Sequence, residues 1–162
     1  MLHVALFWAL LITIAGLALR FGAGPERWTA GMFVAAAVAT RLAHEPVAQR
    51  FYEVEISVLA IDLALLLGLL TVTVVSDRFW PICMVALHLL TVAAHVAKAL
   101  DLQIPRKAYS IALAAPSYGT LALLLAAVVR HQRRLRTLGA DNSWNSSLLR
   151  AAPPTHRSPR TD

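Results

Sequence analysis

The chain has 162 residues, of which 58% are hydrophobic and 15% charged, and its mean hydropathy is +0.62. A soluble domain of this length buries only part of its surface and could not hide so much apolar material. The net charge of +6 does not indicate nucleic-acid binding, because seven of the fifteen Lys and Arg residues follow the last apolar block. We therefore predict an all-α integral membrane bundle that forms one domain and has no nucleic-acid partner.

The apolar residues fall in blocks near the length that crosses a bilayer, which predicts about five transmembrane helices. The predicted spans cover residues 2–19, 28–43, 56–75, 79–100 and 108–129. The first block lacks the basic region and the cleavage site of a secretory signal, so we interpret it as a retained span. A four-span bundle, in which the short second segment does not cross, is the alternative.

Small residues recur every four positions in the second segment, at Gly31, Ala35 and Ala39. Such a stripe lets the backbone of another helix approach closely. A homo-oligomer or a larger membrane complex assembled through this stripe is therefore a hypothesis, beside the lipid bilayer as the expected surrounding.

The link between the third and fourth spans is only Ser76-Asp77-Arg78, so these spans must be antiparallel neighbours. Pro116 predicts a kink in the fifth span unless neighbouring groups satisfy its backbone. The single cysteine, Cys83, lies among apolar residues and is interpreted as a small core hydrophobe.

A change of composition at residue 130 sets the predicted domain limits. A basic collar begins there, formed by Arg130, His131, Arg133, Arg134 and Arg136. We predict a transmembrane bundle over residues 1–136 and a disordered cytoplasmic tail over 137–162. With five spans and the collar inside, the N-terminus lies outside a bacterial inner membrane, in a multi-pass arrangement.

Three ionisable residues, Asp62, His88 and His95, lie inside the predicted spans. An ionisable group at bilayer depth is costly and needs a partner or a role. The two histidines and Thr91 have the three-and-four spacing of one helix face, and antiparallel packing brings Asp62 between the depths of His88 and His95. Tyr118 of the fifth span is expected close to the level of His88. These five residues are the predicted intramembrane polar cluster.

Two further residues extend the same face of the fourth span, Met84 before His88 and Lys98 after His95. Lys98 is expected to be an interfacial anchor whose long stem reaches the headgroups. Trp28, Trp80 and Tyr109 lie at span ends and are expected in aromatic belts.

The polar cluster leaves three functions open. The first is a non-enzymatic accessory or structural membrane component whose polar groups pin the helices together. The alternative is a proton-coupled transport or conduction element that uses Asp62, His88 and His95. A haem-binding redox subunit is the second alternative. No nucleophile and base pair is visible, so no enzyme and no catalytic residue is predicted.

The haem alternative is restricted by geometry, because two histidines on one helix cannot be both axial ligands of one iron. His95 could meet His44 or His3 near the outer surface, which allows one haem at most. A metal site of His44, Asp62 and His95 has suitable ligand types, but no spacing motif supports it. The sequence predicts no cofactor.

The run Ser76-Asp77-Arg78-Phe79-Trp80-Pro81, followed by two histidines in one span, resembles a family of short uncharacterised polytopic inner-membrane proteins of alphaproteobacteria. Asp62, Tyr109, Ser117-Tyr118 and the closing Arg130-His131-x-Arg133-Arg134 are similar too. The likeness covers roughly residues 26–134, and Pro116 stands where an aromatic residue is expected ahead of the Ser-Tyr pair. The resemblance implies a small polytopic protein and brings no activity, substrate or cofactor.

Overall fold

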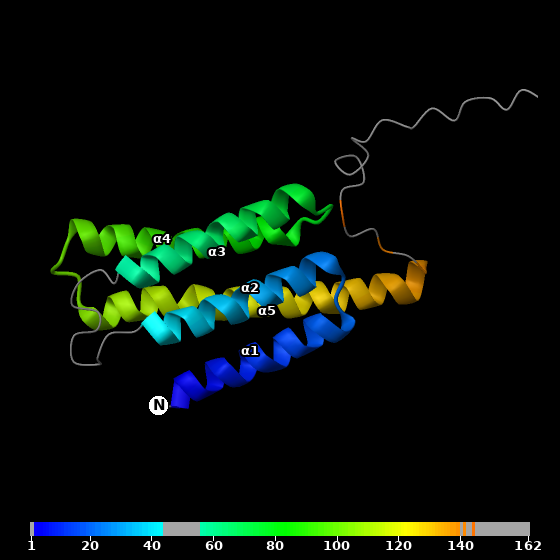
Figure 1. Ribbon diagram of the computed structural model, residues 1–162, viewed down its shortest axis with the longest axis horizontal. Coiled ribbons are helices and arrows are strands. Elements are labelled where there is room, and N and C mark those ends of the chain that lie inside the picture. The colour runs from blue at the N-terminus through cyan, green and yellow to red at the C-terminus, as the bar shows by residue number, and fades with distance from the viewer. Residues whose placement is uncertain (1, 44–55, 140, 142–143, 145–162) are drawn as a thin grey trace, which may run out of the picture.

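Five α-helices form a bundle in the computed structural model, which describes residues 2–43, 56–139, 141 and 144 (Figure 1). The helices are α1 (Leu2–Phe21), α2 (Gly24–Ala43), α3 (Ile56–Val75), α4 (Trp80–Leu100) and α5 (Arg106–Leu138). The described residues contain no strand beyond one isolated bridge between Ser76 and Trp144. The predicted all-α fold is confirmed.

The helices alternate in direction along the chain (Figure 1), and short turns join α1 to α2, α3 to α4 and α4 to α5. One end of the bundle therefore holds the α1–α2 and α3–α4 turns and the C-terminus of α5, and we name it the collar end (Figure 1). The opposite end, where α1, α3 and α5 begin, is the distal end. The end of α2 also lies there.

Four of the described helices, α1, α3, α4 and α5, are long and apolar enough to cross a membrane. Helix α2 has the same length as α1 but carries Glu26 and Arg27 in its first turn and Arg41 near its end. It packs between α1 and α3 and begins four residues before the predicted start of the second span. The structure thus gives the second segment as a helix alongside the others, while its crossing of a membrane stays a prediction.

The centre of the bundle is apolar and receives side chains from all five helices. Its buried residues are Leu11, Ile14, Ala15, Ala18, Ala30, Phe33, Leu69, Met84, Leu121, Leu124 and Val128. The outward faces are apolar as well, with Leu67 65% exposed and Leu90 56% exposed. An apolar exterior of this extent is typical of helices that cross a bilayer.

Helices α2 and α3 approach closely at Gly68, where a side chain would collide with the sulfur atom of Met32. Helix α5 continues through the buried Pro116 as one helix of 33 residues. At 1.5 Å per residue it is about 50 Å long, compared with about 30 Å for the hydrocarbon core of a bilayer. The collar is therefore the helical continuation of α5.

The chain turns back towards the bundle after α5 ends. Gly139 closes the helix with a left-handed conformation, φ 70°, and its N–H donates to the carbonyl of Leu135 at 3.1 Å. The indole of Trp144 then lies against Gly24, where a side chain would overlap it. Trp144 and Asp141 thus contact the bundle, unlike the tail predicted from residue 137; residues 140, 142–143 and 145–162 lie outside the described part.

We expect Leu69→Ala to destabilise the bundle by roughly 2–5 kcal/mol, because it leaves a cavity in the core. Leu69 is 0% exposed, whereas Leu67 on the same helix is 65% exposed. Leu67→Ala is therefore the matched control, with an expected cost of about 0.5 kcal/mol or less. Thermal unfolding in detergent measures both, and equal shifts in Tm would contradict the assignment of the core.

Candidate functional site

A carboxylate and an imidazole meet between α3 and α4 near the distal end. The Oδ2 atom of Asp62 lies 3.0 Å from Nε2 of His95, which is fully buried. Asp62 lies fourteen residues before Ser76, and His95 lies fifteen residues after Trp80. The short turn between these helices therefore brings both side chains to nearly the same height.

Tyr109 extends this contact to α5. Its hydroxyl lies 2.8 Å from Nδ1 of His95, and the two rings meet edge to face with centroids 5.7 Å apart. The carboxylate of Asp62 only accepts, so Nε2 of His95 carries a proton and Nδ1 accepts from the Tyr109 hydroxyl. We call this series the Asp62–His95–Tyr109 chain; it joins α3, α4 and α5.

The side chain of His88 contacts the main chain of Asp62. Its Nε2 atom lies 2.9 Å from the carbonyl oxygen of Asp62 and 3.9 Å from Oδ1 of that side chain. A carbonyl accepts, so Nε2 of His88 donates the hydrogen bond. Asp62 therefore holds His95 with its carboxylate and His88 with its backbone.

The other predicted members of the cluster occupy different surroundings. Thr91 is 4% exposed and lies between the two histidines on α4, and its hydroxyl has no hydrogen-bond partner among the described residues. Tyr118 places its ring edge-on to Phe7 of α1, with centroids 5.8 Å apart. The structure thus joins Asp62, His88 and His95 directly, and Tyr118 contacts α1.

Tyr109 was not predicted to belong to this cluster, because its place at a span end was interpreted as part of an interfacial aromatic belt. It is only 2% exposed. The available signal was the short α4–α5 turn, since a residue at the start of α5 must lie level with the end of α4. His95 and Tyr109 stand at comparable distances from that turn.

The prediction that Lys98 is an interfacial anchor is wrong, because the residue is 2% exposed and does not reach outwards. Its Nζ atom donates to the carbonyl of Leu102 at 2.7 Å and to that of Ile104 at 3.0 Å. These carbonyls belong to the α4–α5 turn, where the backbone has no helical partners. Lys98 therefore stabilises the turn that sets Tyr109 against His95.

The geometry favours hydrogen bonding over metal or haem ligation at His95. Both of its ring nitrogens already have protein partners, Asp62 and Tyr109, so a bond to iron would cost one of these contacts. No three His, Cys, Asp or Glu side chains within the described ranges gather in a way that could hold a metal ion. His44, the remaining proposed ligand, lies outside those ranges.

A second ionic cluster lies at the collar end around Asp141, whose side chain is 0% exposed. Its Oδ2 atom lies 2.7 Å from Nη1 of Arg78 and 2.6 Å from Nδ1 of His131, and its Oδ1 atom lies 3.3 Å from Nε of Arg134. Burial alone would raise the pKa of the Asp141 carboxyl, but the His131 hydrogen bond and the charges of Arg78 and Arg134 lower it below its ordinary value. Asp141 thus attaches the segment after α5 to the α3–α4 turn.

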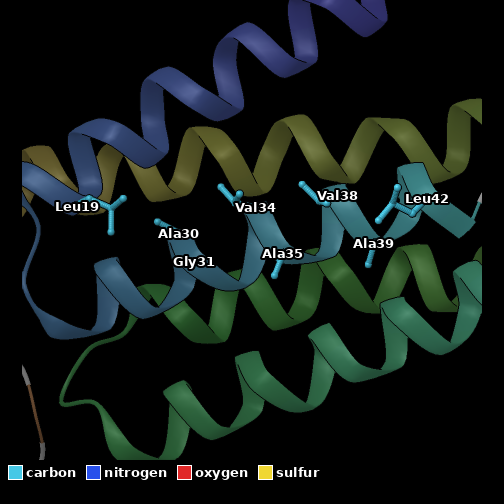
Figure 2. Close-up of a pocket in the computed structure, with 8 residues that line it drawn as sticks. All are labelled: Leu19, Ala30, Gly31, Val34, Ala35, Val38, Ala39 and Leu42. Atoms are coloured by element: carbon cyan, nitrogen blue, oxygen red, sulfur yellow. The ribbon is translucent and has the colours of Figure 1, made fainter.

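The small-residue stripe of α2 faces an open apolar groove of about 560 Å³ (Figure 2). The residues that line it are Leu19, Ala30, Gly31, Val34, Ala35, Val38, Ala39 and Leu42. A methyl group added at Gly31 would meet no atom within 4 Å. At Gly31, therefore, the stripe does not pack against another helix of the described bundle.

No protein-family model matches the chain, and no match to it was found among curated proteins or solved structures. The resemblance to the alphaproteobacterial inner-membrane family therefore stays a prediction.

Acid should loosen the segment after α5 through Asp141. A carboxyl whose pKa is lowered in the folded state stabilises that state above its unfolded pKa of about 3.9. The contribution is lost as the pH falls through the lower folded pKa. We expect Asp141→Asn to cost about 1–3 kcal/mol of local stability at neutral pH, measured by amide hydrogen exchange at the end of α5.

The acid dependence provides the control for this prediction. The opening of the wild-type segment should increase as the pH falls below about 4, whereas Asp141→Asn should be open already and respond less. The same acid response in both proteins would show that Asp141 does not hold the segment.

Proposed function

We propose that the protein is a non-enzymatic multi-pass membrane component in which buried polar contacts hold the helices in one arrangement. The Asp62–His95–Tyr109 chain carries this proposal, because its two hydrogen bonds connect three helices. Helices in lipid lack the hydrophobic driving force that joins helices in water, so packing and interhelical hydrogen bonds must supply the specificity.

The Asp62–His95–Tyr109 chain acts mainly by avoiding the energetic cost of an unpaired carboxylate inside the bundle. An Asp at the centre of a span costs ~2.5–3.5 kcal/mol, whereas a measured interhelical hydrogen bond contributes about 0.6 kcal/mol on average. The hydrogen bond to His95 therefore offsets only part of the cost of burying Asp62. Any arrangement that separates Asp62 from His95 would leave the carboxylate without its partner, and this cost selects the observed arrangement.

The distribution of arginines supports a bacterial inner membrane with the collar end in the cytoplasm and the N-terminus outside. Arg20, Arg27 and Arg78 join the collar at that end, where α1 ends, α2 begins and α4 begins. Helix α2 packs along α1 and α3. Its position supports a fifth crossing beside these two apolar helices.

A proton-coupled transport or conduction element is the second candidate. The observation that favours it is that hydrogen bonds connect a phenol, an imidazole and a carboxyl group without a gap in the Asp62–His95–Tyr109 chain. When Tyr109 gives its proton to Nδ1 of His95 and Nε2 gives its own to Asp62, one proton crosses the chain. Such a shift needs no movement of the helices.

Asp62→Asn separates the two candidates. If the Asp62–His95–Tyr109 chain stabilises the helix arrangement, the variant should express less and unfold at a lower temperature. The reason is that an amide cannot reproduce the charged contact with His95. If the chain conducts protons, the variant should express normally and change proton flux in liposomes. Tyr109→Phe tests the other end, with an expected loss of about 1–3 kcal/mol from the unpaired Nδ1 of His95.

The groove along α2 supports an association in the membrane, and we assign its occupant as a second copy of this chain. A stripe of small residues is complementary to itself across a two-fold axis, so two α2 helices can approach with their backbones close. This pairing would make the protein an assembly component and not an isolated bundle.

We expect Gly31→Leu to abolish the dimer and to leave the folded monomer intact, because the added side chain fills open space. Gly16→Leu on α1 is the matched control, since a side chain there also meets no atom within 4 Å. Crosslinking in native membranes followed by gel separation measures the dimer. Only monomer in the wild type would contradict the proposal.

A further inference from the structure

Arg78 presents half of its guanidinium group without a partner. The side chain is 5% exposed, and its Nη1 atom binds Asp141 at 2.7 Å. Its Nε and Nη2 atoms have no hydrogen-bond partner among the described residues. These two nitrogens form one edge of the planar group, the edge that holds an oxyanion with two parallel hydrogen bonds. A buried edge of this kind calls for an acceptor.

A small cavity lies beside this arginine at the collar end. Its volume is about 90 Å³, and Asp77, Arg78, Trp80, Arg130 and Arg134 are among its lining residues. The indole Nε1 of Trp80 is buried and also lacks a hydrogen-bond partner in the described part of the chain. This volume exceeds the roughly 10–15 Å³ that one water molecule needs on the same measure, so a compact anion has room.

The charges around the cavity leave it positive. Three arginine residues line it, and the carboxylates nearby are those of Asp77 and Asp141. Asp141 is already shared between Arg78, Arg134 and His131. Asp77 is exposed and does not bond to the free edge of Arg78. Three buried donor atoms, Nε and Nη2 of Arg78 and Nε1 of Trp80, therefore lack an acceptor among the described residues, whereas one carboxylate oxygen, Oδ1 of Asp141, lacks a hydrogen-bond donor.

We propose that this cavity binds a phosphate group, held by the free edge of Arg78, the indole N–H of Trp80 and the charges of Arg130 and Arg134. The phosphate belongs either to a lipid headgroup or to a soluble phosphate. The apolar stretch of α5 ends at Val129, so Arg130 stands where the headgroups of a bilayer would lie. The site is at the opposite end from the Asp62–His95–Tyr109 chain and does not depend on its role.

The experiment uses full-length protein in dodecyl maltoside, a detergent without phosphate, labelled with ¹⁵N. The indole resonance of Trp80 reports binding, and Trp80→Phe assigns it among the four tryptophans. Inorganic phosphate is titrated in one arm and phosphatidylglycerol in the other, at constant ionic strength. We expect a saturable shift of the Trp80 resonance in at least one arm.

Arg130→Gln and Arg133→Gln form a matched pair, because both residues are exposed on α5 and only Arg130 lines the cavity. Arg130→Gln should weaken binding about tenfold, the scale of one charge-assisted hydrogen bond, and Arg133→Gln should leave it nearly unchanged. A shift with phosphatidylglycerol alone identifies a lipid headgroup, and a shift with inorganic phosphate identifies a soluble source. No Trp80 shift in either arm, or equal weakening by both variants, would overturn the proposal.

Discussion

The hydrogen bond between Asp62 and His95 joins α3 to α4, and the hydroxyl of Tyr109 extends it to α5. The two groups are ionisable and surrounded by apolar helices, so neither can be left without a partner at low cost. Rotation of α4 by one residue would turn His95 away from Asp62 and His88 away from its carbonyl at the same time. The apolar contacts around them tolerate such rotations better, because they are not directional.

The bundle uses one carboxylate near each end to gather its polar groups. At the distal end Asp62 holds two histidines, and at the collar end Asp141 holds His131, Arg78 and Arg134. The two sets differ in how firmly the backbone of their carboxylate is held. Asp62 belongs to a helix and is fixed by packing, whereas Asp141 follows the end of α5 and attaches a segment with few other described contacts. The second set is therefore the one that a change of pH or a ligand can release more easily.

The sequence predicted the helical fold and the pairing of Asp62 with the histidines, because both depend on local rules. Helical spacing put His88 and His95 on one face, and a short turn made α3 and α4 neighbours. Tyr109 and Lys98 were misassigned because their positions near span ends are equally suited to an interface, and only the close α4–α5 turn directs them inwards. Asp141 could not be found, since a single carboxylate in a polar, Ser- and Arg-rich segment has no periodic signal and its partners come from α5 and the α3–α4 turn.

An odd number of alternating helices has an electrostatic consequence at the collar end. Three helix C-termini, those of α1, α3 and α5, lie there beside only two N-termini, those of α2 and α4. The partial negative charge of the extra backbone end is not cancelled by a neighbour. Arg20 and Arg136 occupy the last turns of α1 and α5. The backbone at these helix ends thus attracts the two cations, which gives the basic character of this end an electrostatic contribution from the fold.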